Sequence, residues 1–312
     1  MRRTSLKMVH ELARRSDRVV FIGSDLGPGT MEEFKQEFPD RYFMEGVAEM
    51  NMIGMAAGLA MEGFIPYVNT IATFLTRRCL EQTAIDLCMH NLPVRLIGNG
   101  GGLVYAPLGP THMATDDFAL MRSIPNMTIV SPSDAEEMKL VMTASLDYPG
   151  PIYVRLGKGG DPIIHNAGDE FNFGSAVPKT GPAGILIVST GVMTGHCLAA
   201  RDIIGEQGLD CAVLHFPTVK PLDEARLIEY AKSARLVVSV EEHSLIGGLG
   251  SAILESLNEH ADTRALPMLR LGLPDRFSKI YGSQAEQLEF LELDAGGIAA
   301  RVAAYVTANQ LS

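Results

Sequence analysis

Short apolar runs alternate along the chain with longer stretches in which apolar residues recur at helical spacing. The runs that carry strand-forming residues are Val19–Gly23, Phe64–Val68, Val94–Gly98, Met127–Val130, Ile152–Arg155, Ile185–Ser189, Cys211–His215, Leu236–Val240 and Met268–Leu271. Several are apolar throughout, which is typical of parallel strands that helices cover on both faces. The helical patterns between them are Met50–Met61, Leu75–His90, Asp134–Ala144, Val192–Glu206 and Gly250–Leu257. This βαβα order predicts an α/β fold with mostly parallel sheets covered by helices.

One stretch, from Gly157 to Gly184, breaks this alternation. It contains seven glycines, at positions 157, 159, 160, 168, 174, 181 and 184, and shows no sustained hydrophobic period. Such a segment is typical of a linker, and a length of 312 residues also favours two domains. We therefore predict a first domain over residues 1–160, a linker over 161–184 and a second domain over 185–312.

Composition and charge narrow the possible partners and the compartment. Hydrophobic residues make up 46% of the chain, enough for a full core. The formal net charge is −11, and this negative charge argues against nucleic acid and anionic membranes as partners. The four cysteines lie in apolar segments without pairing or metal-ligand spacing. No apolar run approaches the roughly 18 residues that span a bilayer. We expect a cytoplasmic protein with reduced thiols.

Glu49 stands at the start of a strongly apolar helical pattern. The turns that follow it, through Met61, are apolar on nearly every side, so we expect a buried helix with a carboxylate at its first turn. Gly54 and Gly58 lie four residues apart on this helix and would let another backbone approach closely. By itself, a glutamate in the first turn of a helix only complements the helix dipole.

A series of segments in the same order along the chain carries a family resemblance. These segments are Arg41–Met52, Asn69–Arg78, Gly109–His112, Arg122–Met127, Ser131–Asp134, Pro217–Asp223, Val240–Gly250 and Gly272–Phe277. They resemble transketolases and 1-deoxyxylulose-5-phosphate synthases, with a Gly-Val-Ala-Glu turn that ends at Glu49 and a Gly-Pro-Thr-His loop that ends at His112. The chain therefore resembles the C-terminal half of a split transketolase. This resemblance implies a pyrimidine-binding domain over residues 1–160 and a transketolase C-terminal domain over 185–312.

The resemblance implies thiamine diphosphate as the cofactor, which serves as a carbanion sink. It gives Glu49 the role of the carboxylic acid that activates the aminopyrimidine ring. Phe74 matches the aromatic residue that stacks on that ring. Ile71 and Arg77 flank Phe74 and would complete the pocket wall. The turn at Asp25 and Leu26 resembles the one beside the thiazole ring, although a plain strand-end turn explains it nearly as well.

Three further residues are implied in substrate binding. His112 matches the family histidine that contacts the substrate and moves protons at the reacting carbonyl, work that suits a side chain titrating near neutral pH. Arg155 resembles an arginine that binds the phosphate of sugar phosphates, for which a guanidinium is well matched. Leu108 stands where the family usually has an aspartate that contacts substrate hydroxyls.

The diphosphate-binding motif of the family is absent from the sequence. No Gly-Asp-Gly occurs in the chain, so the Mg²⁺ ligands are expected on a separate N-terminal subunit. The resemblance thus implies an enzyme that is active only with this partner, in an α2β2 assembly. Its reaction would transfer a two-carbon ketol unit from a ketose-type donor to an aldehyde acceptor.

Two departures from the family pattern bear on the substrate. Leu108 replaces the hydroxyl-binding aspartate, and Asn99–Gly102 lacks the cationic residue that binds phosphate. We therefore expect a less hydroxylated or unphosphorylated substrate. A β subunit of a 2-oxo acid dehydrogenase, an acyloin- or deoxyxylulose-forming synthase and a non-catalytic α/β regulatory subunit stay open as alternatives. A nicotinamide dehydrogenase is disfavoured because the glycine fingerprint is missing.

Overall fold

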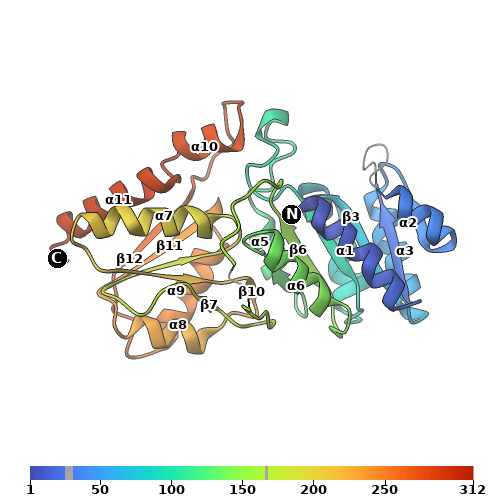
Figure 1. The fold of residues 1–312 in the computed structure, drawn as a ribbon, viewed down its shortest axis with the longest axis horizontal. Helices are drawn as coiled ribbons and strands as arrows, with labels where there is room; N and C mark the ends of the chain where they lie inside the picture. Colours follow the sequence, from blue (N-terminus) through green and yellow to red (C-terminus); the bar gives the residue numbers. More distant parts are fainter. Residues whose placement is uncertain (25–30, 166–167, 312) are drawn as a thin grey trace. The chain divides into compact units, whose positions relative to one another are not determined.

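The computed structural model describes residues 1–24, 31–165 and 168–311. Asp25 and Leu26 lie outside the described residues. The chain divides into two compact units, and Figure 1 traces it through both. The first unit comprises residues 1–101 and 120–172, and the second unit comprises residues 102–119 and 173–312.

A parallel sheet forms the centre of the first unit. Its strands are β1 (Val19–Gly23), β2 (Tyr42–Met44), β3 (Ile65–Ile71), β4 (Arg95–Asn99), β5 (Thr128–Val130) and β6 (Ile152–Leu156). They run in the order β5-β6-β4-β3-β1-β2, and every neighbouring pair is parallel. All five residues of β1, β4 and β6 are buried, as expected for strands covered on both faces. The carboxyl ends of β3, β4 and β6 therefore lie at one edge of the sheet.

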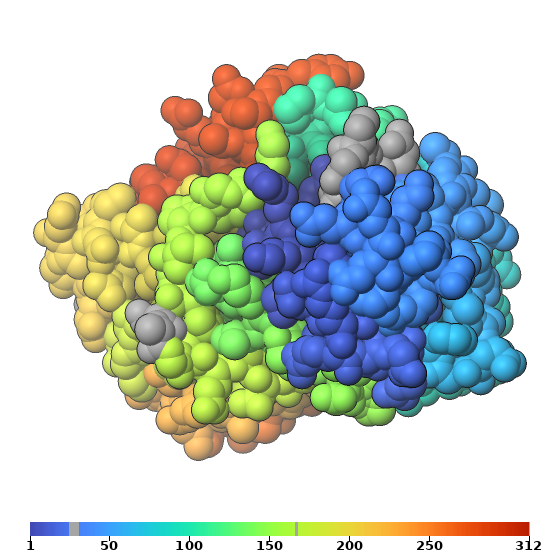
Figure 2. All heavy atoms as spheres, turned by 45° about the vertical axis from the view of Figure 1, so that its right-hand side comes forward, coloured from blue at the N-terminus to red at the C-terminus, as the bar shows by residue number. Residues whose placement is uncertain are grey.

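Helices and helical turns surround this sheet. They are α1 (Arg2–Arg15), α2 (Glu32–Glu37), η1 (Pro39–Arg41), α3 (Glu49–Met61), η2 (Phe74–Arg78), α4 (Leu80–Gln82), η3 (Thr83–Cys88) and α6 (Ala135–Ser145). Two further helical elements involve the 102–119 segment of the second unit: η4 (Ala106–Leu108) lies within it, and α5 (Asp117–Arg122) begins in it. α1 packs against α6, and Figure 2 shows α1, in dark blue, at the surface beside the green segment that contains α6. Asp134 caps α6 by accepting hydrogen bonds from the backbone N–H groups of Glu136 and Glu137.

The second unit has its own sheet. Its elements are β7 (Val177–Pro178), β8 (Ile185–Ser189), α7 (Met193–Glu206), β9 (Cys211–His215), β10 (Thr218–Lys220), α8 (Glu224–Ala231), β11 (Leu236–Ser244), α9 (Leu249–Glu259), β12 (Met268–Leu273), α10 (Gln284–Phe290) and α11 (Ala295–Ala308). The sheet order is β12-β11-β8-β9-β7, and only β7 pairs antiparallel among these strands. Figure 1 shows α7 and α11 side by side on one face and α8 and α9 on the other.

Alternation along the strands of the second unit explains its two cores. Ile185 and Ile187 of β8 pack with α7 and α11, whereas Leu186 and Val188 pack with α8 and α9. Successive strand side chains point to opposite faces of the sheet, so an apolar strand supplies both cores at once. The predicted α/β class with mostly parallel, helix-covered sheets is therefore confirmed. In the described part of the chain, no helix is long and apolar enough to cross a membrane.

Two expectations about the helices near Glu49 need correction. The Leu75–His90 pattern forms helical pieces with π-helical turns at η2 and η3 in place of one regular helix. α3 buries one face only: Met50, Gly54, Gly58 and Met61 are exposed. A Cβ atom added at Gly54 or Gly58 would meet nothing within 4 Å in the described chain. The close backbone approach predicted for these glycines is thus not made there.

Candidate functional site

Glu49 lies where the sequence predicts it, at the first position of α3. Its side chain is only 2% exposed, although a carboxylate is among the groups most costly to bury alone. The burial is offset by Arg78, whose Nη1 donates a hydrogen bond of 2.5 Å to Glu49 Oε2. A hydrogen bond between a guanidinium and a carboxylate is charge-assisted. Glu49 and Arg78 thus form a half-buried ion pair.

The same Arg78 guanidinium also contacts the predicted stacking residue. Its Cζ lies 4.4 Å from the centroid of the Phe74 ring, within the usual range of a cation–π contact. Both residues belong to η2, where the four-residue spacing brings the two side chains to the same side of the turn. A single planar group therefore touches the carboxylate of Glu49 and the ring of Phe74. The sequence analysis missed Arg78, although its spacing from Phe74 was a usable signal.

Burial also shapes the chemistry of the neighbouring Cys79. Desolvation, and to a smaller extent the negative charge of Glu49, raises the pKa of the Cys79 thiol to about 12. This thiol is therefore protonated at neutral pH. Its sulfur is a packing atom of the site and not a nucleophile.

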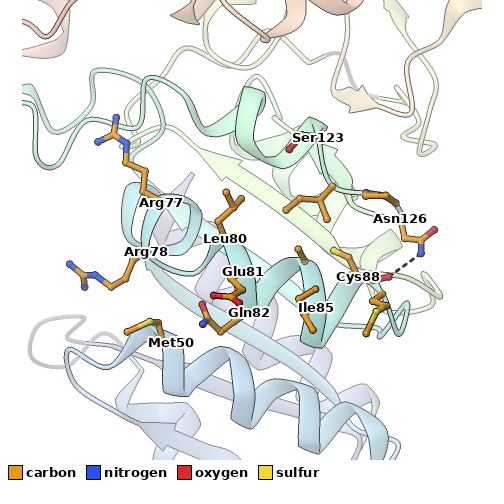
Figure 3. Close-up of a pocket in the computed structure, with 14 residues that line it drawn as sticks. Met50, Arg77, Arg78, Leu80, Glu81, Gln82, Ile85, Cys88, Ser123 and Asn126 are labelled. Atoms are coloured by element: carbon orange, nitrogen blue, oxygen red, sulfur yellow. Dashed lines mark hydrogen bonds between the residues drawn. The ribbon is translucent and has the colours of Figure 1, made fainter.

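A cavity of about 910 Å³ opens beside this cluster within the first unit. It is lined by Met50, Arg77, Arg78, Leu80, Glu81, Gln82, Ala84, Ile85, Cys88, Met89, Ser123, Ile124, Pro125 and Asn126. Figure 3 shows Met50 on α3, and Arg77 and Arg78 on the turn with side chains that extend away from the other labelled residues. Asn126 Nδ2 donates a 2.9 Å hydrogen bond to the Cys88 carbonyl. Arg77 lines this cavity together with Arg78. Ile71, half-buried, ends β3 just before this turn.

Polar residues gather at the carboxyl ends of the central strands. Asn69 of β3 and Asn99 of β4 are buried and bond to each other, with Asn99 Nδ2 donating to Asn69 Oδ1 at 2.9 Å. Arg155 of β6 is 6% exposed, and its side chain lies against Gly101, where a Cβ atom would overlap it. A buried arginine at such a sheet edge suits an anionic ligand, because ligands of parallel α/β sheets bind outside the carboxyl ends of the strands.

Two predicted site residues belong to the second unit. His112 follows a turn in which its backbone N–H donates to the Gly109 carbonyl at 3.0 Å, and its Nδ1 lies 2.9 Å from Thr111 Oγ1. Leu108 ends η4 with 54% of its surface exposed. The loop that carries both is tied down by Glu242, which accepts a 2.8 Å hydrogen bond from the backbone N–H of Leu103.

A buried polar cluster supports this loop within the second unit. Glu241 accepts hydrogen bonds from the backbone N–H groups of Leu249 and Gly250, at 2.7 and 2.9 Å, at the start of α9. Burial raises the pKa of the Glu241 carboxyl despite the opposing effect of His243. His243 Nδ1 donates to the Ser244 carbonyl, and its Nε2 accepts from the Ala119 backbone N–H. These bonds fix the orientation of the ring and hold the end of the 102–119 segment.

The fit of the Glu49 cluster to an aminopyrimidine can be tested on this geometry. The cofactor ring is flat, aromatic and rich in hydrogen-bonding groups at its rim, and the guanidinium of Arg78 is a flat group with donors at its rim. Arg78 contacts Phe74 and Glu49 at once, so a single flat group with donors at its rim fits between these two residues. No group of three or more metal-ligating side chains occurs among the described residues.

The sequence matches two families of protein domains in succession. Residues 1–160 match the transketolase pyrimidine-binding domain, and residues 174–298 match the transketolase C-terminal domain. The chain is 35% identical to a 6-deoxy-6-sulfo-D-fructose transketolase subunit of Clostridium sp. (strain MSTE9), over 90% of this chain and 86% of that one. It is 38% identical to the 1-deoxy-D-xylulose-5-phosphate synthase of Bordetella petrii over 92% of its own length, and spans about half of that synthase, 45%.

Solved structures agree with these matches. A split-gene transketolase, described as an inactive β4 tetramer, superposes with a TM-score of 0.90 at 32% identity, and the match covers 98% of both chains. The predicted resemblance to the C-terminal half of a split transketolase is thus confirmed, as is the predicted transketolase-like, thiamine diphosphate-dependent transferase that works with a partner subunit. The chain belongs to the transketolase family, as the subunit that carries its pyrimidine-binding and C-terminal domains.

Proposed function

We propose that this chain supplies the aminopyrimidine half of a thiamine diphosphate site, with Glu49 as the residue that activates the cofactor. The observation that carries the proposal is the buried Glu49 carboxylate, which shares one planar partner with the ring of Phe74. Thiamine diphosphate, when bound, supplies the electron sink for transfer of a two-carbon ketol unit. Glu49 would hold a proton against the ring, and Phe74 would fix the plane of that ring by stacking.

The pocket wall around this pair follows from its neighbours. Ile71 and Arg77 are proposed to line the ring, supported by the position of Arg77 in the cavity wall and of Ile71 at the end of β3. Asp25 and Leu26 are proposed to lie beside the thiazole on the strength of the sequence resemblance. We retain residues 1–160 as the pyrimidine-binding domain, 161–184 as a linker and 185–312 as the C-terminal domain.

Substrate handling is assigned to His112, Arg155 and Leu108. His112 would exchange a proton with the reacting oxygen, and the buried guanidinium of Arg155 would bind an anionic group of the donor or acceptor. Leu108 presents an exposed apolar side chain where the family usually has a carboxylate, so a donor with fewer hydroxyls, or without phosphate, is favoured. The relative named for 6-deoxy-6-sulfo-D-fructose lends weight to a donor outside the ordinary pentose phosphates.

The partner is proposed to be an N-terminal transketolase-like subunit with the Gly-Asp-Gly motif and the Mg²⁺ ligands, in an α2β2 complex. Exposed apolar side chains around the cavity support a docking surface there: Met50, Met61, Ile85 and Met89 are 51%, 56%, 49% and 63% exposed. The similar split-gene transketolase chain forms an inactive tetramer of its own kind, as a subunit without its partner would. A cytoplasmic location is proposed with the four free thiols.

The proposal is tested by calorimetric titration of thiamine diphosphate with Mg²⁺ into this chain alone and into its complex with the N-terminal subunit. Binding is expected only in the complex. Glu49→Ala should lower ketol-transfer turnover by about 10²–10⁴-fold, the usual contribution of a positioned acid–base group. Glu62→Ala, at the opposite end of α3, is the matched control and should leave turnover unchanged. Full turnover in Glu49→Ala would refute the assignment.

One alternative is examined with the same complex. The exposed apolar Leu108 also suits a small 2-oxo acid, the donor of a 2-oxo acid dehydrogenase or an acyloin-forming synthase. Pyruvate decarboxylation faster than ketol transfer from any ketose would favour that reading. Efficient use of xylulose 5-phosphate with ribose 5-phosphate would contradict the proposed departure from ordinary sugar phosphates.

A further inference from the structure

Arg78 occupies the space that the proposed function gives to the cofactor ring. Its guanidinium bonds to Glu49 Oε2 at 2.5 Å and stacks over Phe74 at 4.4 Å. A guanidinium is planar, delocalised and carries N–H donors around its edge, so it can imitate a protonated heterocycle on both counts. An aminopyrimidine that bonds to Glu49 and stacks on Phe74 cannot do so while Arg78 does.

We propose that Arg78 is a built-in plug of the cofactor site, which the aminopyrimidine ring must displace before it binds. This inference rests on the proposed function, since it takes Glu49 and Phe74 as the residues that hold the ring. In the unliganded chain, this plug gives the buried Glu49 carboxylate its hydrogen-bond partner. Once displaced, Arg78 moves outward and leaves both contacts to the cofactor.

The difference in burial between the two partners explains why Arg78 is the one to move. Glu49 is 2% exposed and fixed at the first turn of α3, whereas the Arg78 side chain is 39% exposed. A carboxylate left alone at that depth would be costly, because a buried charge needs a partner. A half-exposed arginine, by contrast, regains water when it swings away. The site therefore exchanges one hydrogen-bond partner for another without leaving Glu49 unpaired.

The plug has a measurable consequence for affinity. A ligand that binds only the open state has its apparent affinity reduced by the fraction of molecules that are open. An ion pair with one half-exposed partner and one cation–π contact together favour the closed state by about tenfold. Removal of the plug should thus tighten binding through faster association, with dissociation unchanged, since the bound state does not contain the closed contact.

The test uses the complex of this chain with its N-terminal subunit and measures thiamine diphosphate binding by calorimetry and stopped-flow fluorescence. Arg78→Ala is expected to lower Kd about tenfold, equal to about 1.4 kcal/mol, through the association rate. Arg78→Lys keeps the positive charge but not the planar guanidinium, so its Kd should fall between those of the wild type and Arg78→Ala. Arg201→Ala is the matched control, because Arg201 is 38% exposed and pairs with Asp202 on α7. It should leave both rates unchanged.

A second measurement compares thermal unfolding of the unliganded chain with that of the cofactor-saturated complex. Arg78→Ala should lower the thermal midpoint of the unliganded chain, and saturating cofactor in the complex should close that gap, because the ring then replaces the guanidinium at Glu49. A merely structural arginine would leave the gap the same in both states.

The outcomes separate the two proposals. If the wild-type complex fails to bind thiamine diphosphate, the proposed function fails and the plug fails with it. Suppose that the wild type binds thiamine diphosphate and Glu49→Ala abolishes turnover. If Arg78→Ala then binds the cofactor at the wild-type rate, or binds it more weakly, only the plug is overturned. Weaker binding would mean that Arg78 holds the bound cofactor.

Discussion

Arg95 is the residue whose replacement should most damage the first unit. It is fully buried in β4, and its guanidinium donates to three backbone carbonyls: Nε to Ser145 at 2.7 Å, Nη1 to Gly150 at 2.7 Å and Nη2 to Tyr148 at 2.5 Å. These carbonyls lie between the end of α6 and the start of β6. Arg95 thereby closes a helix end whose carbonyls have no partner within the helix. It also anchors the strand pair that places Asn99 and Arg155 at the sheet edge.

The size of the effect follows from these bonds. Arg95→Met keeps most of the volume but removes a donor from three carbonyls, at about 1–3 kcal/mol for each one that stays buried without another partner. Ser145 keeps a 3.4 Å bond from the Tyr148 backbone N–H. Against this, burial of the charge already penalises the wild type, as the lowered pKa of the Arg95 guanidinium shows. Relief of that desolvation offsets several kcal/mol. We therefore expect a net loss of about 3–5 kcal/mol, the usual cost when one member of a buried charged network is removed.

Native-state hydrogen exchange read by mass spectrometry is the appropriate assay, because a chain of two compact units need not unfold in one step. Peptides that cover β4 and β6 should lose protection, whereas peptides from β8 and β11 of the second unit should keep it. Arg14→Met is the control: Arg14 pairs with Glu37 at the surface, so its loss should leave the protection of β4 and β6 nearly unchanged. A loss below about 1 kcal/mol in Arg95→Met would refute the account of the three carbonyl bonds.

Three further predictions concern titratable groups. Because the pKa of the Cys79 thiol is raised to about 12, maleimide should label Cys79 about a thousandfold more slowly in the folded chain than in urea, read by peptide mapping; equal rates would contradict its burial. Glu37 accepts hydrogen bonds from Arg14 and His10, and these lower the pKa of Glu37 to about 2. The bond between Glu37 and α1 should therefore be lost as pH falls from about 4.5 towards about 2, and Glu37→Gln should flatten acid unfolding in that window. An unchanged acid limb would count against this account. Burial raises the folded-state pKa of Glu241, so the wild type should lose stability relative to Glu241→Gln as pH rises above about 4.5. Urea unfolding at several pH values measures the difference in free energy of unfolding between the two proteins. A difference that changes in the opposite direction with pH would contradict this account.

The strands and the large helices could be predicted because burial leaves a direct trace in the hydrophobic pattern. β1, β8 and β9 match their predicted bounds, and α3 begins one residue before its apolar pattern. β3 is longer than predicted because Asn69 and Thr70 are polar yet buried. Each finds a side-chain partner, Asn99 and Ser24, which a hydrophobic pattern cannot reveal.

The π-helical turns, and the position of the 102–119 segment in the second unit, could not be predicted from the sequence, for different reasons. A π turn adds a residue to the helical repeat, so the period-based reading of Leu75–His90 gave a single helix. The 102–119 segment belongs to the second compact unit. It is held there by contacts such as the hydrogen bond from the Leu103 backbone N–H to Glu242, two residues that are 139 positions apart in the sequence. Local propensity carries no information about a contact of that range. Arg78 was missed for a similar reason, because its role depends on Glu49 and not on its own neighbours alone.

Buried polar side chains of the first unit find their partners in pairs. Asn69 pairs with Asn99, and Ser24 Oγ pairs with Thr70 Oγ1 at 2.6 Å, at the carboxyl ends of the central strands. Glu49, at the start of α3, pairs with Arg78 of η2. Unpaired, each would cost stability in the dry interior. The first two pairs join fixed strands, whereas Arg78 projects from a turn and is half-exposed. Only the third pair can therefore open cheaply, and it is the one that contains the proposed catalytic carboxylate.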